Sequence, residues 1–177
     1  SGDSEILKIM GRRYTIEEYR TLCDKIMTRI PGCAVSTDII VGFPNESDEQ
    51  FEHTMEIVDY CKFDNAFTFI YSPREGTPAA RMRDNVPMEV KQARLARLNE
   101  RWNSYALEKN KAYEGRVLKV LVDGPSKKNE SAYSGYTETN KLVNFSAEGV
   151  AAGDIVEVRI TQARTWSLHG ELVSREK

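Results

Sequence analysis

Two predicted strands end in segments whose backbone and side chains could bind a flat ligand. The β-branched run 34–41 continues into Val41-Gly42-Phe43-Pro44, and the run 67–71 continues into Tyr71-Ser72-Pro73-Arg74. In parallel α/β folds ligands bind at the carboxyl ends of strands, where the loops converge. An apolar shelf beside free backbone N–H and C=O groups suits an adenine. We therefore predict a binding site here; the alternative is that these segments only turn the chain.

One carboxylate interrupts the first apolar strand. Asp38 lies within residues 34–41, where a lone charge would be costly unless it is paired. It could hold an arginine such as Arg12 or a ribose hydroxyl, and a purely structural ion pair is an equal alternative.

The three cysteines do not have the spacing of a metal centre. Cys23, Cys33 and Cys61 are separated by 10 and 28 residues, and no CxxC pair is present. Isolated cysteines are usually small buried apolar residues, and we expect that here.

Basic and aromatic residues are interleaved after residue 113. Cations that face phosphates, together with aromatic side chains that stack on bases, are typical of RNA-binding barrels. This stretch contains nine basic and nine acidic residues, so an RNA contact must be local. The candidates are Lys127, Lys128, Tyr133, Tyr136, Lys141, Phe145, Arg159, Arg164 and Trp166, of which Phe145 is expected in the core.

Other charged positions are expected on the surface. A basic stripe on the last long helix is predicted to be a solvated face, because charge on a helix usually serves solubility. His53 and His169 stand alone and are expected at the surface. The stripe is made of Lys91, Arg94, Arg97 and Arg101.

Alternating helix and strand patterns must position these groups. Capping boxes at 15–18 and 47–50 predict two helix starts, and apolar residues recur behind each at helical spacing. Behind the first box these are Tyr19, Leu22, Ile26 and Ile30. A long helix should follow Pro87, and short β-rich runs after Gly115 predict a small all-β barrel.

Only two strands of the parallel type are present, so the first part resembles a piece of a larger barrel or sheet. We expect an exposed apolar sheet edge there, which a dimer could cover.

The totals are those of an ordinary globular protein. The chain has 177 residues, 40% of them hydrophobic, and its 25 basic and 27 acidic residues give a net charge of −2. No apolar run approaches the ~20 residues that cross a bilayer, and no export signal is apparent. These features predict a cytoplasmic protein with no membrane partner.

Four ordered segments carry a family resemblance. They are SGDSEILKIMGRRYT (1–15), TDIIVGFP (37–44), FTFIYSPREGTPAA (67–80) and GYTETNKLVNF (135–145). Together they resemble the MiaB-type tRNA methylthiotransferases, a branch of the radical SAM enzymes. Asn45 stands where that family usually has glycine, so the turn after Pro44 departs from the family pattern.

The resemblance implies a fold and a division of the chain. The fold class is α/β: residues 1–112 resemble the C-terminal part of a radical SAM (β/α) partial barrel. Residues 113–177 resemble a small all-β, OB-like TRAM barrel that binds RNA. The RNA-binding residues expected in it are Lys127, Lys128, Tyr136, Lys141, Arg164 and Trp166.

The resemblance also implies cofactors. Such enzymes use S-adenosylmethionine and two 4Fe-4S clusters to methylthiolate carbon 2 of an isopentenyl-adenosine next to the anticodon of tRNA. The family's cluster cysteines lie upstream of the matching part, so this chain alone should be inactive. Arg12 aligns with the arginine of a family motif and could bind the cofactor's carboxylate. The cofactor-binding set is Arg12, Asp38, Val41, Gly42, Phe43, Pro44, Tyr71 and Ser72.

Alternative functions remain at this point. The chain could be a non-catalytic RNA-binding module with an α/β scaffold. It could also belong to relatives that act on threonylcarbamoyl-adenosine in tRNA or on a ribosomal protein. The SGDS start and the YSPREGTPAA loop resemble the tRNA enzymes, and the TNKLVNF run favours the isopentenyl-adenosine group.

Overall fold

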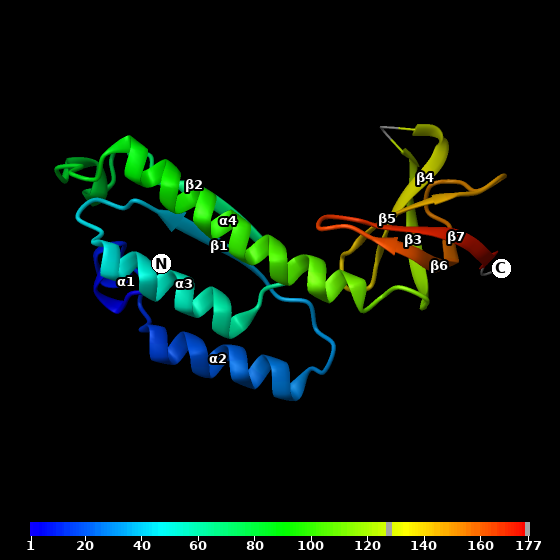
Figure 1. Cartoon of the computed structure of the whole chain (residues 1–177), viewed down its shortest axis with the longest axis horizontal. Helices are drawn as coiled ribbons and strands as arrows, with labels where there is room; N and C mark the ends of the chain where they lie inside the picture. Colours follow the sequence, from blue (N-terminus) through cyan, green and yellow to red (C-terminus); the bar gives the residue numbers. More distant parts are fainter. Residues whose placement is uncertain (127–128, 176–177) are drawn as a thin grey trace. The chain divides into compact units, whose positions relative to one another are not determined.

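The computed structural model describes residues 1–126 and 129–175, which form two compact units, Ser1–Asn103 and Ser104–Lys177 (Figure 1). The helices are α1 (Ser4–Ile9), α2 (Ile16–Arg29), α3 (Asp48–Cys61), the 3-10 turn η1 (Pro78–Arg81) and α4 (Met88–Lys111). The strands are β1 (Ser36–Val41), β2 (Asn65–Ile70), β3 (Val117–Ser126), β4 (Asn129–Thr137), β5 (Leu142–Ser146), β6 (Ile155–Ala163) and β7 (Leu168–Arg175). Within the described ranges, no helix is long and apolar enough to cross a membrane.

Both predicted capping boxes are present. The Thr15 hydroxyl accepts the Glu18 amide while the Glu18 carboxylate accepts the Thr15 amide, and Ser47 and Gln50 do the same for α3. These reciprocal bonds satisfy amides that have no partner inside the helix. The two predicted helix starts are therefore confirmed.

The first unit contains a two-stranded parallel sheet with one covered face. β1 pairs with β2 in the register Asp38↔Phe67 and Ile40↔Phe69. Ile39 and Val41 point to the opposite face and are buried, as is Ala66 on β2. Among the described residues neither strand has a second neighbour, so the dimer through a free edge stays a prediction.

The apolar stripe of α2 is less buried than its spacing implies. Leu22 is 53% exposed and Ile30 is 56% exposed, and the one buried residue of this helix is Cys23. An apolar stripe becomes core only where a second layer lies against it. The described part of the chain places such a layer along only a small part of α2.

Half of the basic stripe of α4 is buried. Lys91 and Arg94 are buried, whereas Arg97 and Arg101 are exposed, and all four form ion pairs with acidic residues of α3, of the loop before it or of the loop before α4. These pairs are Lys91–Asp84 at 2.5 Å, Arg94–Glu46 and Arg94–Asp48 at 2.8 Å, Arg97–Glu52, and Arg101–Asp59 at 3.3 Å. The solvated-face prediction was wrong for Lys91 and Arg94, because helical spacing does not reveal which neighbouring element covers a charge. Arg97 and Arg101 are exposed as predicted.

The second unit contains a closed five-stranded barrel with the strand order β3-β4-β5-β7-β6. β5 and β7 are parallel, and the other neighbours are antiparallel. Val120, Val143, Val158 and Leu168 are fully buried inside it, and Phe145 is in the core as predicted. The prediction of a small all-β barrel is confirmed.

The boundary between the units depends on the criterion. The sequence places it at residues 112–113, after the long helix, whereas the division by contacts falls at Asn103/Ser104, within α4. The last turns of α4 are grouped with the barrel because Asn110 bonds to the backbone of Arg164 and Thr165.

The Arg94–Glu46 pair should dominate the stability of the α3–α4 interface. Glu46 is fully buried and Arg94 is 7% exposed, so Arg94→Ala would leave a buried carboxylate without its charge partner. We expect the free energy of unfolding to fall by about 3 kcal/mol. Arg101→Ala removes a pair whose partners are 45% and 40% exposed, and should cost less than about 1 kcal/mol. Urea unfolding of both variants measures the difference; equal losses would contradict this ranking.

Candidate functional site

The structure brings together five of the eight predicted cofactor-binding residues. Val41, Gly42, Phe43, Pro44 and Tyr71 are all buried at the ends of β1 and β2. The rings of Phe43 and Tyr71 meet edge-to-face with centroids 5.0 Å apart, and both pack against Ile6 of α1. The strand ends therefore form one small apolar cluster.

This cluster is not the open shelf that the sequence predicted. The Gly42 amide donates to Oε1 of Glu46 at 2.9 Å, and the Tyr71 amide donates to the Val41 carbonyl at 2.9 Å. The Gly42 and Tyr71 amides are thus already bonded within the chain. Nothing in the local sequence shows that Glu46 turns back onto the strand end, and the adenine contact stays a prediction.

Arg12, Asp38 and Ser72 do not join the cluster, because all three are exposed. Asp38 is exposed on β1, so its charge is in contact with solvent. The predicted pair between Arg12 and Asp38 does not form in the described part of the chain. Strand patterning could not decide this, because it shows which residues share a face but not which face is covered.

Lys91 is the residue of this region that the sequence analysis missed. Its side chain is 2% exposed and lies under Gly42, while its Nζ atom donates to Asp84 and lies 5.5 Å from the Tyr71 ring centroid. A signal was available: Lys91 precedes Leu95, Leu98 and Trp102 at the spacing of the buried helix face. A lysine on the buried face of a helix either pairs with an acidic group or extends its ammonium group to solvent.

Two buried polar atoms near the strand ends lack a partner. They are the Tyr71 hydroxyl and Oε2 of Glu46. Burial raises the pKa of Glu46, although the Gly42 amide and Arg94 both favour its charged form. Unpaired buried groups of this kind are what an added polar ligand or a water could satisfy. The cluster therefore fits part of a cofactor site, with a carboxylate acceptor and a phenol.

Gly42 should be intolerant of a side chain. Its φ is +68°, and an added Cβ would lie 2.4 Å from Cγ of Lys91. Gly32 also has a positive φ, +78°, but open space around it. We expect Gly32→Ala to cost about 1 kcal/mol from backbone strain, and Gly42→Ala about 1–3 kcal/mol more from overpacking.

A double-mutant cycle tests the cause. In a Lys91→Ala background the excess cost of Gly42→Ala should largely disappear, as measured by urea unfolding. An unchanged excess would mean that Lys91 is not the obstacle.

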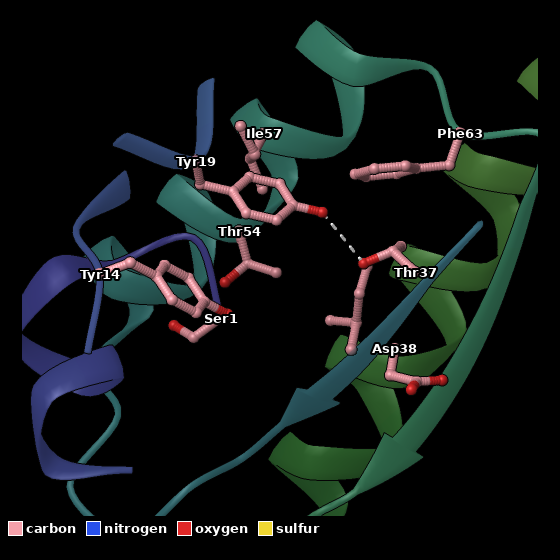
Figure 2. Close-up of a pocket in the computed structure, with 9 residues that line it drawn as sticks. Ser1, Tyr14, Tyr19, Thr37, Asp38, Thr54, Ile57 and Phe63 are labelled. Carbon is pink, nitrogen blue, oxygen red and sulfur yellow. Dashed lines mark hydrogen bonds between the residues drawn. The ribbon is translucent and has the colours of Figure 1, made fainter. Parts of the chain in front are cut away.

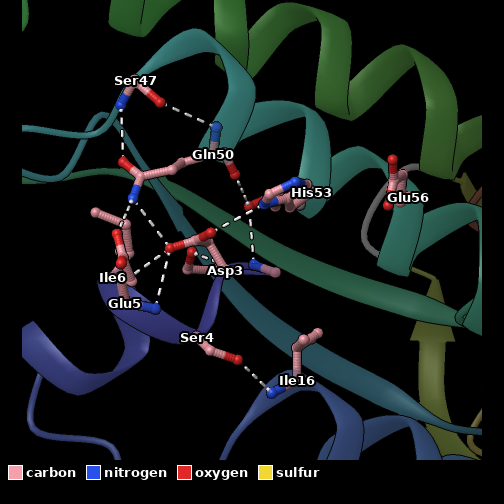
Figure 3. Close-up of polar contacts among 12 residues, drawn as sticks. Asp3, Ser4, Glu5, Ile6, Ile16, Ser47, Gln50, His53 and Glu56 are labelled. Carbon is pink, nitrogen blue, oxygen red and sulfur yellow. Dashed lines mark hydrogen bonds and ion pairs between the residues drawn. The ribbon is translucent and has the colours of Figure 1, made fainter.

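The SGDS start of the chain fastens α1 to α3 (Figure 3). Asp3 caps α1 by accepting the Glu5 and Ile6 amides at 3.1 and 3.0 Å. Oδ1 of Asp3 also accepts a hydrogen bond from Nε2 of Gln50 at 3.1 Å. Its Oδ2 lies 2.9 Å from Nδ1 of His53. His53, expected to stand alone, is therefore half of an ion pair across the two helices.

Gly2 allows this close approach. An added Cβ there would lie 2.2 Å from the His53 carbonyl oxygen, and the Gly2 amide donates to Oγ1 of Thr54 at 2.9 Å. The SGDS segment therefore has a structural role: it packs α1 against α3.

The Asp3–His53 pair makes stability depend on pH. Burial would raise the pKa of Asp3, but hydrogen bonds from the Ile6 amide and from His53 outweigh it and lower that pKa. The hydrogen bond with Asp3 raises the pKa of His53. Because the pKa of Asp3 is lowered, its carboxylate stabilises the fold at pH values above the ordinary carboxyl pKa. This stabilisation is lost as the pH falls through the lowered pKa. Because the pKa of His53 is raised, its protonated ring stabilises the fold at pH values below the ordinary imidazole pKa. This stabilisation is lost as the pH rises through the raised pKa.

The pair should therefore contribute most between about pH 4 and pH 6.5. Between pH 6 and pH 8.5 the parent chain should lose more unfolding free energy than His53→Gln loses over the same range. Urea unfolding at the two pH values tests this, and parallel losses in both proteins would exclude the pair as the cause.

A shallow pocket lies between α2, α3 and β1 (Figure 2). Thr37, Asp38 and Ile39 all line it, and because consecutive strand residues alternate between faces, the pocket runs along the edge of β1. The Tyr19 hydroxyl lies 3.3 Å from Oγ1 of Thr37, and burial raises the pKa of Tyr19 to about 12. The phenol therefore stays protonated at neutral pH.

The cysteines do not form a cluster site. Cys23 and Cys61 are buried, and burial together with a hydrogen bond between the two thiols raises the pKa of Cys61. Cys33 is exposed, which corrects the expectation that it is buried. The described residues contain no group of three or more potential metal ligands, so they do not fit a 4Fe-4S cluster.

The predicted RNA-binding residues gather mainly at one end of the barrel. Tyr136 lies at the end of β4, Lys141 directly before β5, and Arg164 and Trp166 in the β6–β7 loop. These positions share one end because β5 and β7 are parallel and β4 is antiparallel to β5. Trp166 is 70% exposed and Tyr136 is 42% exposed, as stacking requires.

Three lysines of the predicted RNA-binding set differ from the exposed residues at this end of the barrel. Lys141 is 9% exposed, so it is less available to a phosphate than its charge implied. The predictions for Lys127 and Lys128 concern side chains outside the described residues.

Asn110, which the sequence analysis did not identify, fixes the loop that carries Trp166. It is 2% exposed, and its Nδ2 atom donates to the carbonyls of Arg164 and Thr165 at 2.8 and 3.0 Å. Tyr113, just after α4, makes a similar contact: its hydroxyl lies 3.4 Å from Oγ1 of Thr139, in the turn between β4 and β5. The end of α4 and the turn after it thus hold the two loops that flank the exposed aromatic residues.

Comparisons with known proteins agree with both units. Residues 1–58 match the Radical SAM superfamily, and residues 111–173 match the TRAM domain. Proteins described as tRNA-2-methylthio-N(6)-dimethylallyladenosine synthase from Bacillus cytotoxicus and Bacillus cereus are 60% identical to this chain, and that of Bacillus anthracis is 59% identical. Each match covers 98% of this chain. The chain spans about a third of the length of these curated relatives, 34% in each case.

Proposed function

Since this chain belongs to the MiaB-type tRNA methylthiotransferases of the radical SAM superfamily, we propose that it is the tRNA-holding part of such an enzyme. In this proposal the complete protein methylthiolates carbon 2 of an N6-dimethylallyl-adenosine beside the anticodon. It acts in the cytoplasm, and this third of its length does not catalyse the reaction alone. The similarity of 60% over nearly the whole chain to enzymes named for that reaction is the main support.

The first unit would contribute to the S-adenosylmethionine site. The cofactor, when bound, supplies the methyl group and the radical chemistry of the family. Glu46 would accept a hydrogen bond or a positive charge through its unpaired oxygen, and the Tyr71 hydroxyl would bond to a polar group. Phe43 would offer apolar surface beside them, while the exposed Arg12 and Ser72 would need the rest of the protein to reach the same ligand. The two 4Fe-4S clusters belong to residues outside this chain.

The barrel would hold the tRNA. Its exposed aromatic residues at one end, fixed by Asn110 and accompanied by Arg164, suit stacking on unpaired bases with a nearby phosphate contact. The lack of net charge over residues 113–177 implies modest affinity, with the remaining recognition supplied elsewhere.

Two alternatives differ in substrate. Relatives acting on threonylcarbamoyl-adenosine tRNA or on a ribosomal protein would share the α/β unit, so modified nucleosides and proteins compared after gene deletion separate these cases. A non-catalytic RNA-binding module would bind tRNA but leave every nucleoside unchanged.

Binding to an anticodon stem-loop RNA tests the barrel's part. Fluorescence anisotropy should show an affinity that falls as salt rises, because phosphate contacts release counterions. Trp166→Ala should weaken binding about fivefold or more, since one base–aromatic stack is worth about 1–3 kcal/mol.

Val173→Ala is the matched control. Val173 is 48% exposed on the same barrel, but near the far end of β7, and this variant should bind as the parent does. Absence of binding at low salt, or equal weakening by both variants, would refute the barrel as an autonomous tRNA contact.

A further inference from the structure

The β6–β7 loop, residues 164–167, carries an aromatic side chain that does not anchor it. Trp166 is 70% exposed, so burial of its ring contributes little to fixing the loop. The Arg164 amide donates to the Ser167 carbonyl at 2.8 Å, which closes the turn without attaching it to another element. The attachment of the loop backbone comes instead from two side chains outside the loop.

Asn110 and Glu114 supply that attachment. Nδ2 of Asn110, at the end of α4, donates to the carbonyls of Arg164 and Thr165 at 2.8 and 3.0 Å. Oε1 of Glu114, in the turn after α4, accepts the amide of Ala163 at 2.8 Å. These hydrogen bonds hold three consecutive residues at the point where β6 passes into the loop.

The chemistry of Asn110 suits this task better than it suits stability. The amide nitrogen of asparagine carries two hydrogens, so one side chain can bond to two neighbouring carbonyls. Its Oδ1, in contrast, accepts no hydrogen bond from any described residue, although Asn110 is 2% exposed. A buried acceptor without a bond is destabilising, and asparagine forms helices less well than leucine or alanine. A buried polar residue with this cost calls for a role other than stability.

We propose that Asn110 is a positioning residue for the RNA contact made by Trp166. This inference rests on the proposed function and adds to it a residue that is too buried to touch RNA itself. By holding the loop in one conformation before RNA arrives, Asn110 removes the entropic cost of ordering the loop on binding. Helix α4 therefore takes part in RNA binding, although the match to the TRAM domain begins only at residue 111.

Asn110→Leu separates positioning from stability. Leucine has nearly the shape of asparagine but no polar side-chain atom, so it removes both donors and the unbonded acceptor together. The midpoint of urea unfolding should be at or above that of the parent chain. The affinity for the anticodon stem-loop RNA, measured by fluorescence anisotropy, should nevertheless fall about threefold or more, because the loop must now be ordered on binding. Asn110→Ala should weaken RNA binding in the same way, and it keeps the test decisive if leucine disturbs the fold.

Two readouts show whether the effect passes through Trp166. In a Trp166→Ala background, Asn110→Leu should cause no further loss of RNA affinity, because the side chain that Asn110 positions is gone. Without RNA, nuclear magnetic resonance relaxation should give the indole N–H of Trp166 a lower order parameter in Asn110→Leu than in the parent. That indole signal is identified as the one that Trp166→Ala removes. A residue that only stabilised the fold would weaken binding equally in both backgrounds.

Thr161→Val is the matched control. The Thr161 hydroxyl donates to the His169 carbonyl at 3.3 Å, so this variant also removes a hydrogen bond from a side chain to the backbone on the β6–β7 hairpin, but outside the loop. It should leave both the RNA affinity and the order of the Trp166 indole unchanged. Unchanged affinity in both Asn110 variants, or an equal loss in the two backgrounds, would overturn the proposal.

The result is distinguishable from failure of the proposed function. If Trp166→Ala weakens RNA binding but neither Asn110 variant does, the positioning role is wrong while the tRNA contact of the barrel stands. If Trp166→Ala itself leaves RNA binding unchanged, the tRNA contact at this loop is refuted, and the positioning role is refuted with it.

Discussion

The conformation of the β1 strand end depends on one buried ion pair. Glu46 accepts the Gly42 amide on the same oxygen that receives Nη1 of Arg94, and the Arg94 guanidinium also bonds to the Glu46 carbonyl. A buried charge is tolerated only when it is both paired and hydrogen-bonded. The pair therefore links the turn after β1 to α4 and keeps Gly42 in its left-handed conformation.

Two further contacts follow from that constraint. With the turn fixed, the Phe43 ring packs against Tyr71, and the stem of Lys91 fills the space that a side chain on Gly42 would need. The strand ends are thus preformed and apolar, with only the Tyr71 hydroxyl and one Glu46 oxygen left unsatisfied. A ligand that arrives there meets a rigid surface, which lowers the entropic cost of binding.

The two faces of the small sheet have different physical roles. The face with Ile39 and Val41 is buried within this unit and contributes to its stability. The face with Phe67 and Phe69 contributes little to folding, because its rings remain largely in contact with water. In the barrel, Trp166 is likewise largely exposed to solvent, at 70%.

The sequence by itself determined the elements and the family. Capping boxes, apolar spacing and turn residues predicted the helix starts, the parallel strands and the β-rich barrel, because these signals act over a few residues. The ordered motifs at 1–15, 37–44, 67–80 and 135–145 indicated the family, and the matches to curated relatives support it.

Only the tertiary structure decided which charges are buried and which apolar residues are exposed. Arg94, Glu46 and Asn110 have the pattern of ordinary polar residues of helices and loops, yet each is buried against a partner far away in the sequence. Lys91 is also buried, although its partner Asp84 is only seven residues away. Conversely, Leu22, Phe67 and Phe69 have the pattern of core residues but remain exposed. The reason is that burial is a property of two facing surfaces, and a local pattern specifies only one of them.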